Sequence, residues 1–306
     1  MRGALWSNGE LREVACDCCG ADDAIRVIVR PDGLTVVECR ACGLAYVSPR
    51  PRPELIDQLY DAGYFEGEHE DVGYRSYMRP NRAERIRSRR AMAERLRILR
   101  IHEDIRGRTV LEVGCATGEF AARAARAGGM VTGADVSQAA IDAAREAHGR
   151  VAQFSVGDYH AEAGPWDVVC AFEVIEHVNS PSDFLSSMRS KVKPGGLLFI
   201  STPDYQRSKE VGPERWIGFI LSLEHLTFFS HDVLASLAAR TGFRVEAWYG
   251  LGGGIAEHPA PRSRARRLLS TSGLVRPLRT AKAFFESPPR YQLHQTGHNV
   301  LMVLRG

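Results

Sequence analysis

A carboxylate and two glycines follow one another closely where an apolar run gives way to a predicted helix. Glu112 lies near the end of the run, and Gly114 and Gly118 bound the short loop before a helix that we expect from Glu119. Glycines at such a junction let a ligand approach the backbone, beside the N–H groups that a helix leaves unpaired at its start. Because Ala116 stands where a dinucleotide-binding loop has its second glycine, the spacing does not predict a pyrophosphate ligand. A tight turn without a ligand is the alternative.

Two further acidic residues follow the next apolar strands along the chain. Asp135 comes after segment 130–134, 23 residues beyond Glu112, and Asp158 comes shortly after segment 152–156. A carboxylate about 20 residues after a glycine loop, at the tip of the second strand, is placed to accept hydrogen bonds from ribose hydroxyls. The pattern therefore predicts a bound nucleoside.

Five segments between residues 110 and 202 resemble, in type and order, the class I S-adenosylmethionine (SAM) methyltransferases. The glycine loop is similar to motif I of that family, segment 166–173 to its motif IV, and segment 193–202 to its fifth strand and the preceding turn. The resemblance implies an α/β fold: a Rossmann-like sheet of seven strands in the order 3-2-1-4-5-7-6, with helices on both faces. We expect segments 244–249 and 299–304 to be strands six and seven, an antiparallel pair.

The same resemblance implies where the cofactor binds. A carboxylate at the tip of the first strand suits the cationic sulfonium and ammonium groups of SAM. An acidic residue after the third strand meets the adenine amino group, and its neighbour packs on the ring. The residues expected at the cofactor are Glu112, Gly114, Cys115, Gly118, Asp135, Val136, Asp158, Tyr159 and Phe172. The thiols of Cys115 and Cys170 are expected in the core as small apolar groups, not as ligands or nucleophiles.

Four of the seven cysteines have the spacing of metal ligands. They form two C-x-x-C-G turns, as Cys16, Cys19, Cys39 and Cys42. Segments 25–29 and 34–38 supply a hairpin between the turns, so that four thiolates can surround one ion. We therefore expect a zinc ribbon before the core, with a structural zinc ion. Disulfides are the alternative, which a cytoplasmic location disfavours. Cys18 is a spare thiol beside the site.

Length, charge and hydropathy limit the remaining choices. The net charge of +3 is too small to indicate a polyanionic partner, and the basic clusters at 79–100 and 262–279 have the spacing of solvated helix faces. The chain has no run of 18 apolar residues, and residues 1–10 lack the apolar centre of a signal peptide, so we expect a cytoplasmic protein without a membrane span. The expected parts are a zinc ribbon (1–50), a helical lid or linker (51–105), the SAM-binding core (106–250, including an acceptor-side segment at 203–231), a basic insertion (251–297) and the last core strand (298–306).

A histidine is the first candidate for work on the methyl acceptor. His225 follows Glu224 in a segment that resembles the E-H-x-x-x-F segment of sugar C-methyltransferases, which places a histidine over the substrate. An ordinary imidazole pKa near 6.5 suits a general base. Ser222 and Leu223 stand where tyrosine often comes in that family. The alternative is a histidine that only bonds a backbone carbonyl.

A second candidate group follows the fourth expected strand. Glu173, Glu176 and His177 form a hexapeptide similar to the E-V-x-E-H-V segment of the ubiquinone-pathway O-methyltransferases, where these residue types are associated with a divalent cation. The same hexapeptide occurs in methyltransferases without a metal ion, where it shapes the pocket or caps a helix. We favour the metal-free interpretation, with His177 beside the reacting groups.

Aromatic residues form the third group. Tyr64 and Phe65 precede Tyr74 and Tyr77, in a segment that closes over SAM and the acceptor in many relatives, and Trp216 is a candidate wall on the other side. We expect Tyr74, Tyr77 and Trp216 to contact the acceptor. Ordinary packing between ribbon and core is the alternative.

These observations predict in-line methyl transfer from SAM to a small-molecule acceptor, such as a nucleotide-linked sugar, a polyketide or a quinone-like ring. His225 is the expected general base, with Glu224 and His177 beside it. An RNA methyltransferase that grips nucleic acid with its ribbon is the alternative, but the ribbon has few basic residues between its cysteine turns for phosphate contacts, namely Arg26, Arg30 and Arg40. A non-catalytic SAM-fold scaffold is disfavoured by the complete set of carboxylates and glycines. The insertion could cap the acceptor pocket or form a homodimer contact.

Overall fold

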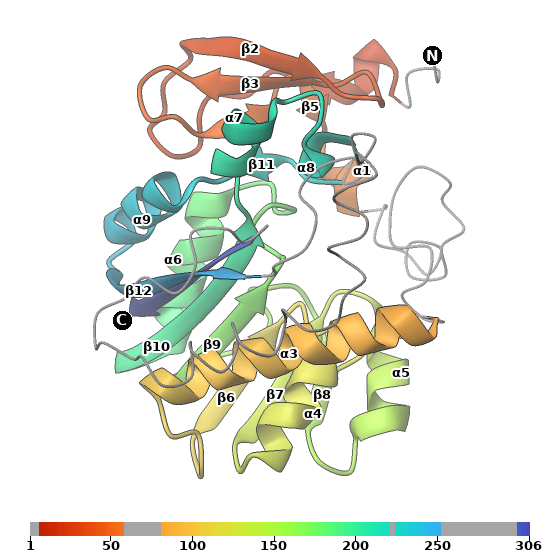
Figure 1. Ribbon diagram of the computed structural model, residues 1–306, viewed down its shortest axis with the longest axis vertical. Coiled ribbons are helices and arrows are strands. Elements are labelled where there is room, and N and C mark those ends of the chain that lie inside the picture. Colours follow the sequence, from red (N-terminus) through yellow and green to blue (C-terminus); the bar gives the residue numbers. More distant parts are fainter. Residues whose placement is uncertain (1–5, 58–80, 221–223, 252–298) are drawn as a thin grey trace, which may run out of the picture.

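The computed structural model describes residues 6–57, 81–220, 224–251 and 299–306 (Figure 1). The expected basic insertion at 251–297 lies outside these residues apart from its first position. Within the described ranges, no helix is both long enough and apolar enough to cross a membrane.

A seven-stranded sheet forms the centre of the molecule. From one edge to the other its strands are β8 (Gln153–Val156), β7 (Met130–Asp135), β6 (Thr109–Val113), β9 (Trp166–Phe172), β10 (Val192–Pro203), β13 (Asn299–Arg305) and β12 (Arg244–Leu251). The first five are parallel, whereas β13 runs antiparallel to both β10 and β12. Numbered along the chain, this order is 3-2-1-4-5-7-6, which confirms the expected fold.

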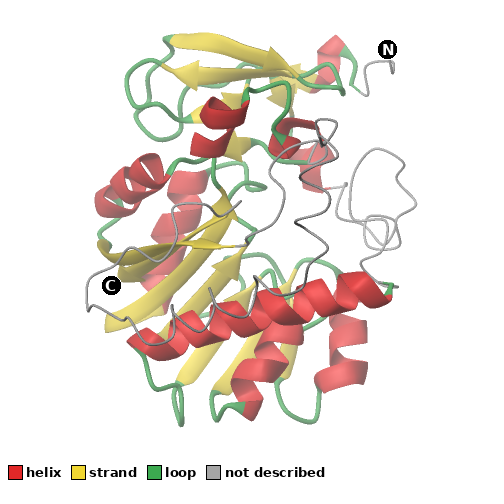
Figure 2. Ribbon diagram, viewed as in Figure 1, coloured by secondary structure: helices red, strands yellow, loops and turns green. Residues whose placement is uncertain are grey.

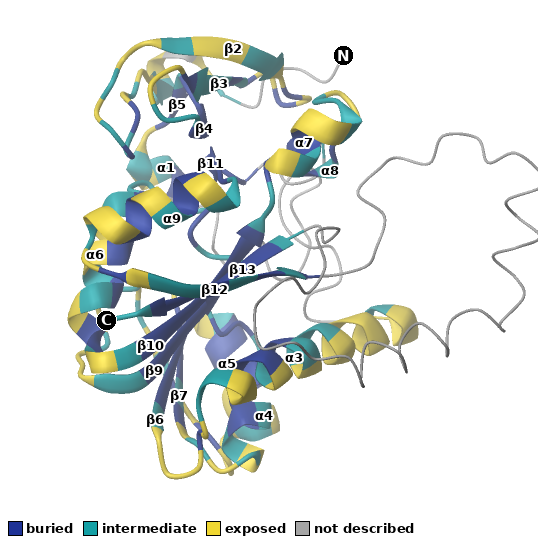
Figure 3. Ribbon diagram, turned by 60° about the vertical axis from the view of Figure 1, so that its left-hand side comes forward, coloured by how far each residue is buried: buried dark blue, intermediate teal, exposed yellow. Residues whose placement is uncertain are grey.

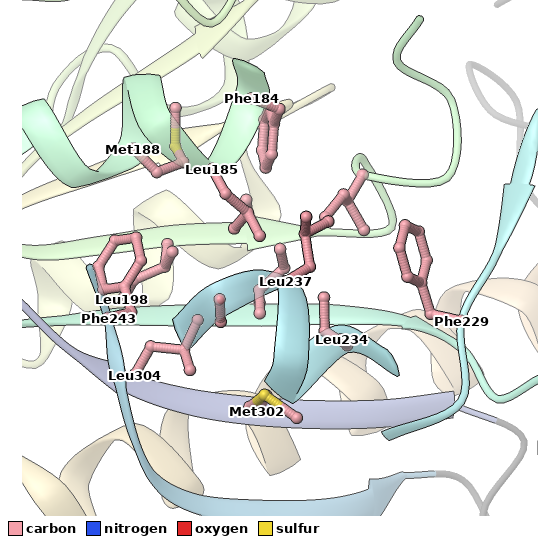
Figure 4. Close-up of a cluster of buried hydrophobic side chains, with 14 of the residues drawn as sticks. Phe184, Leu185, Met188, Leu198, Phe229, Leu234, Leu237, Phe243, Met302 and Leu304 are labelled. Atoms are coloured by element: carbon pink, nitrogen blue, oxygen red, sulfur yellow. The ribbon is translucent and has the colours of Figure 1, made fainter. Parts of the chain in front are cut away.

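Helices cover both faces of this sheet (Figure 2). One face carries α3 (Arg82–His102), α4 (Glu119–Arg126) and α5 (Gln138–His148), and the other carries α6 (Pro181–Lys191) and α9 (His231–Arg240). Side chains alternate along β10, because successive residues of a strand point to opposite faces. Phe199 packs with the α3 side, and Leu198 and Ile200 pack with α6 and α9. Figure 4 shows Leu198 in this cluster with residues of both helices.

Helix α3 is the longest helix described, and its start is defined by its sequence. The Asn81 side chain accepts from the backbone N–H groups of Ala83 and Glu84, and the Glu84 carboxylate accepts from the Asn81 N–H in return. This capping box satisfies donors that a helix otherwise leaves unpaired. The C-terminal half of α3 buries Ile98 and Leu99 against the sheet, whereas its N-terminal half is exposed (Figure 3).

A second, four-stranded sheet lies at one end of the molecule (Figure 1). Its order is β11 (Thr227–Phe228), β4 (Ala45–Val47), β3 (Thr35–Cys39) and β2 (Ala24–Val29), with β2 and β3 forming the expected hairpin. Short elements flank it, namely the 3-10 helix η1 (Asn8–Glu10), the pair β1 (Leu11–Arg12) and β5 (Arg50–Pro51), and α1 (Pro53–Asp57). Strand β11 comes from the acceptor-side segment, so this sheet joins two distant parts of the chain.

The acceptor-side segment also shares a hydrophobic core with the ribbon. Helices α7 (Gln206–Val211) and α8 (Ile217–Ile220) lie beneath the ribbon sheet in Figure 1. The core residues of the two parts are Leu34, Val36, Ala45, Val47, Tyr205, Trp216, Phe219 and Phe228. The Tyr205 hydroxyl donates to Glu38 of β3 at 2.6 Å. Residues 205–220 and 224–229 therefore pack with the ribbon, although the sequence predicts segment 203–231 as part of the core.

Polar contacts fix the ribbon on the large domain from another side. Asp17 of the first cysteine turn accepts hydrogen bonds from the Ser182 N–H at 2.6 Å and from the Ser180 hydroxyl at 2.9 Å. These residues lie at the start of α6, where a carboxylate satisfies unpaired N–H groups and the helix dipole favours negative charge. Arg50 donates to the Asn179 carbonyl at 2.6 Å.

Candidate active site

The loop between β6 and α4 has a backbone that requires glycine. Gly114 and Gly118 have φ values of +70° and +75°, in the left-handed region. A Cβ on Gly114 would lie 2.5 Å from Cγ2 of Val174, and one on Gly118 would lie 2.6 Å from Cε1 of Phe154. The loop therefore combines a conformation that favours glycine with packing that leaves no room for a side chain.

Glu112 lies beneath this loop and faces the start of α4. Its side chain is almost fully buried, and its Oε2 accepts from the Ala121 N–H at 2.9 Å. The carboxylate thus supplies the helix cap that Gly118, at the N-cap position, has no side chain to provide. Burial raises the pKa of Glu112 to about 8, although the Ala121 hydrogen bond and the charge of Arg95 lower it. A cation bound beside this carboxyl would favour its ionised form.

Asp135 ends β7 and holds the loop from the side. Its Oδ2 accepts from the Ala116 N–H at 2.8 Å, and its Oδ1 accepts from the Ser137 N–H at 3.0 Å. Burial raises the pKa of Asp135, and these backbone hydrogen bonds lower it. Since β6 and β7 are adjacent and parallel, Glu112 and Asp135 lie near the same edge of the sheet, as the sequence predicts.

The remaining residues expected at the cofactor follow the next strand ends. Val136 is half-exposed, whereas Cys115 and Phe172 are buried. Asp158 is exposed, and its Oδ1 accepts from the His160 N–H at 2.9 Å. The Tyr159 hydroxyl donates to Asp183 at 2.9 Å, and burial, followed by this contact, raises the pKa of Tyr159. The loops after β6, β7 and β8 are neighbours along the sheet, so one elongated ligand can span them.

Glu173, the residue after β9, is already engaged. Arg95 of α3 donates to its Oε1 at 3.0 Å, the Ser201 hydroxyl donates to the same oxygen at 2.5 Å, and the Asn299 amide donates to Oε2. The Arg95 guanidinium also lies 5.2 Å from the centre of the Phe172 ring. Arg95 is not among the residues predicted from the sequence, although its position in the apolar stripe of α3, between Met92 and Leu99, indicates a buried side chain.

Three other polar side chains do come together on the acceptor side. One potential ligand atom from each of Glu176, His177 and His225 lies within 4.8 Å of the others. The two imidazole rings meet edge to face, with centres 4.6 Å apart. Glu173 is not part of this group, so the structure does not assemble the hexapeptide set of Glu173, Glu176 and His177 as ligands of one cation.

Burial controls the charge of this cluster. It lowers the pKa of His177 to about 4 and that of His225 well below its usual value, the latter helped by His177 and Arg30. The expectation of an ordinary pKa for His225 is therefore wrong, because the ring is removed from water. Burial also raises the pKa values of Glu176 and Glu224. At neutral pH the cluster presents neutral imidazoles.

Several atoms of the cluster lack partners in the part of the chain that the structure describes. Neither carboxyl oxygen of Glu176 has a hydrogen-bond partner there, nor have Nδ1 of His225 and Oε2 of Glu224. In native proteins, buried polar atoms almost always have a hydrogen-bond partner in the protein, in water or in a ligand. Within the described residues, these atoms are therefore the candidates to meet a ligand.

The aromatic residues expected at the acceptor differ in outcome. Trp216 is 1% exposed and packs against Phe219 and Phe228, with ring centres 4.7 and 5.9 Å away. It belongs to the core beneath the ribbon, as the alternative of ordinary packing predicts, and its contact with the acceptor stays a prediction. Tyr64, Phe65, Tyr74 and Tyr77 lie outside the described residues, as do Ser222 and Leu223.

The cysteine turns converge as their spacing predicts. The sulfur atoms of Cys16 and Cys42 are 3.4 Å apart, those of Cys19 and Cys39 are 3.5 Å apart, and all four lie within 4.8 Å of one another. No disulfide joins them. Four sulfurs at about 2.3 Å from one zinc ion in a tetrahedron are about 3.8 Å apart, so the cluster fits that ion. Cys18 is buried nearby and is not one of the four.

A family model described as a methyltransferase domain matches residues 82–247. The chain belongs to this methyltransferase family. The matched range contains the glycine loop, β6 to β10 and the Glu176, His177 and His225 cluster. The ribbon precedes it.

Curated relatives of this methyltransferase are similar over part of its length. A ubiquinone biosynthesis O-methyltransferase of Roseobacter denitrificans is 34% identical over 131 residues, which is 40% of this chain and 50% of the relative. The protein of the same name from Thiobacillus denitrificans is 31% identical over 170 residues, 51% of this chain and 73% of the relative. The chain thus spans about half the length of the first of these relatives.

A solved structure shows a likeness over most of the chain. Magnesium protoporphyrin IX methyltransferase from Synechocystis PCC 6803, with bound SAH, is similar with a TM-score of 0.53 over 83% of this chain and 99% of that chain. The sequence identity is 14%, so the likeness concerns the fold alone.

Proposed function

We propose that this protein transfers the methyl group of SAM to a hydroxyl oxygen of a small-molecule acceptor. The family membership supports methyl transfer, and the names of the curated relatives support an oxygen acceptor. The observation that carries the proposal is the meeting of His177 and His225, two buried neutral imidazoles, beside the end of β9.

The cofactor is proposed to bind across the loops after β6, β7 and β8. Glu112 would face the cationic end, Asp135 the ribose hydroxyls, and Asp158 with Tyr159 the adenine. Bound SAM supplies an electrophilic methyl group. The glycine loop supports this assignment because its left-handed glycines allow a tight turn between β6 and α4, beside Glu112 and Asp135.

The acceptor is proposed to meet Nδ1 of His225, which has no partner among the described residues. In the transfer, the acceptor oxygen forms a bond to the methyl carbon, the bond from that carbon to sulfur breaks, and the hydroxyl proton moves to His225. Holding the reacting atoms in line provides much of the acceleration in such reactions. Glu176, Glu224 and His177 would line the same site.

The depressed pKa of His225 makes it a weak base, which favours an acidic hydroxyl. A phenol gives up its proton far more readily than a sugar hydroxyl, so a phenol-like acceptor suits this base better.

The ribbon has few basic side chains with which to bind nucleic acid. Of the three arginines between Cys16 and Cys42, Arg30 is buried, and this leaves Arg26 and Arg40 for phosphate contacts in that stretch.

The ribbon is proposed to hold one structural zinc ion through Cys16, Cys19, Cys39 and Cys42. Four protein ligands leave no open position on a tetrahedral ion, so this metal would stabilise the fold and not take part in chemistry. We further propose that residues 205–220 and 224–229 belong with the ribbon and not with the core, because they share a sheet and a hydrophobic core with it.

A two-step experiment tests the proposed function. Titration calorimetry with SAM and SAH measures cofactor binding, and mass spectrometry then screens phenolic, sugar and RNA acceptors for the gain of one methyl group from SAM. His225→Gln should retain SAM affinity and lose about 10²-fold or more in kcat. The matched control is His231→Gln, because His231 stacks on Trp248 away from the cluster. Full activity of His225→Gln, or methylation of RNA alone, would overturn the proposal.

A further inference from the structure

A buried ion pair lies at the turn of the ribbon hairpin, where charged residues usually face water. Arg30 and Asp32 have side chains that are 0% and 1% exposed. Nε of Arg30 donates to Oδ1 of Asp32 at 3.2 Å, and Nη2 donates to Oδ2 at 2.5 Å. Asp32 also accepts from the Leu34 N–H at 3.2 Å, which fixes the carboxylate within the turn.

A contribution to stability does not by itself explain this buried ion pair. Removing two charges from water costs much of what their attraction returns, so apolar residues would often stabilise the same turn equally well. What apolar residues cannot do is direct a hydrogen-bond donor to a chosen acceptor. The planar guanidinium presents its donors in a fixed fork, and Asp32 engages one side of that fork.

The other side of the fork reaches the acceptor-side segment. Nη1 of Arg30 donates to the backbone carbonyl of His225 at 2.7 Å, across 195 positions of the chain. The next N–H, that of Leu226, donates to the Glu176 carbonyl at 2.8 Å, and the Leu226 carbonyl accepts from the Val47 N–H at 2.9 Å. The peptide that carries His225 is therefore held by the ribbon on one side and by the large domain on the other.

We propose that Arg30, aimed by Asp32, is a positioning residue that holds the His225 ring against His177 for methyl transfer. The inference rests on the proposed function, in which His225 receives the acceptor proton. It gives the ribbon a role in the reaction, because the ribbon supplies one of the contacts that set the backbone of His225. Without Arg30 the carbonyl loses a charged donor, and the peptide can rotate and carry the ring out of line.

Arg30→Met and Arg30→Lys test this role, with Arg26→Met as the control. Arg26 lies on β2, the strand that ends just before Arg30, and is exposed. Lysine keeps the positive charge but lacks the fork, so it should not restore the geometry. Both Arg30 variants should lower kcat by about tenfold or more, because small displacements of reacting groups are costly. Their dissociation constants for SAM should stay within about twofold of the wild type, and Arg26→Met should match the wild type throughout.

A second measurement needs no acceptor. The imidazole signals of His225, assigned by comparison with His225→Asn, are followed by NMR in the full-length protein. In the wild type they should show the ring-current shift of a histidine stacked edge to face on His177, and in both Arg30 variants this shift should be lost. Arg26→Met should preserve it.

These readouts separate the two proposals. If the wild type turns over no acceptor, the proposed function fails, and NMR alone decides whether Arg30 holds the ring. If the wild type is active and both Arg30 variants, folded as judged by thermal unfolding, keep its kcat and the His225 signals, the positioning role is wrong. Should Arg30→Met fail to fold, Arg30→Lys and Asp32→Asn carry the same test.

Discussion

Arg95 of helix α3 donates a hydrogen bond to Glu173 at 3.0 Å, at the point where β9 ends. The contact joins the helix that covers one face of the sheet to the edge where the proposed reaction occurs. It also keeps the Glu173 carboxylate with Ser201 and Asn299, apart from the Glu176 and His225 cluster. Two carboxylates of one hexapeptide thus have different environments, one ion-paired and one buried without a partner among the described residues.

The raised pKa of Glu112 predicts pH-dependent cofactor binding. Burial holds the carboxyl protonated up to about pH 8, whereas the cationic end of SAM binds its ionised form better. SAM affinity should therefore increase as the pH rises from about 7 through 8, and binding should release a proton. Calorimetry in buffers of different ionisation enthalpy measures this release. Glu112→Gln should bind more weakly and remove the proton release, and an unchanged proton release in that variant would contradict the assignment.

The close contact at Gly118 predicts that alanine is not tolerated there. In Gly118→Ala the new methyl group would lie 2.6 Å from the Phe154 ring, in a residue with φ of +75°. We expect SAM affinity to fall about tenfold or more, measured by calorimetry on folded protein. Gly195→Ala is the matched control, because its φ is +76° but nothing lies within 4 Å of a Cβ. Equal effects of both variants would show that backbone strain, and not the contact, is responsible.

The burial of Trp216 predicts a stability defect. Trp216→Ala would leave a cavity among Tyr205, Phe219 and Phe228, and such changes cost about 3–5 kcal/mol. Urea denaturation should show this loss, whereas Trp248→Ala should cost less, because Trp248 is only partly buried. If the Trp216→Ala variant is as stable as the wild type and has a raised KM for the acceptor, Trp216 contacts the acceptor and its role is not purely structural.

Loss of the zinc ion should destabilise the ribbon. Cys19→Ser should reduce the zinc content from about one ion per chain to about zero and lower the midpoint of thermal unfolding, because the ion closes the two cysteine turns. Cys18→Ala should keep its zinc, since Cys18 is not one of the four clustered thiols. Elemental analysis and thermal unfolding measure both effects. Retention of zinc by Cys19→Ser would remove that residue from the ligand set.

The sequence predicts the large sheet well because its signals are local. Each parallel strand is a short apolar run, and the turn after β6 has glycines at positions whose backbone demands them. The two C-x-x-C-G turns are likewise recognisable from the local spacing of their cysteines. The order of all seven strands followed from the resemblance to a known fold.

What the sequence could not provide are contacts between distant segments. Thr227 and Phe228 form a strand of two residues that pairs with Tyr46 and Ala45, and so short a strand has no periodicity to detect. The burial of Arg30 could not be predicted either, because an arginine in a hairpin turn is expected to face water. Its burial depends on Asp32 and on the His225 carbonyl, far along the chain.

The central claim is that SAM binds at the ends of β6 and β7. The most direct test is calorimetric titration of the wild-type protein and of the Asp135→Asn variant with SAM. The account predicts saturable binding of one SAM per chain, weakened about tenfold or more in Asp135→Asn, because that carboxylate would accept from the ribose hydroxyls. Absence of any binding heat with SAM and with SAH, or equal affinity in wild type and variant, would contradict it.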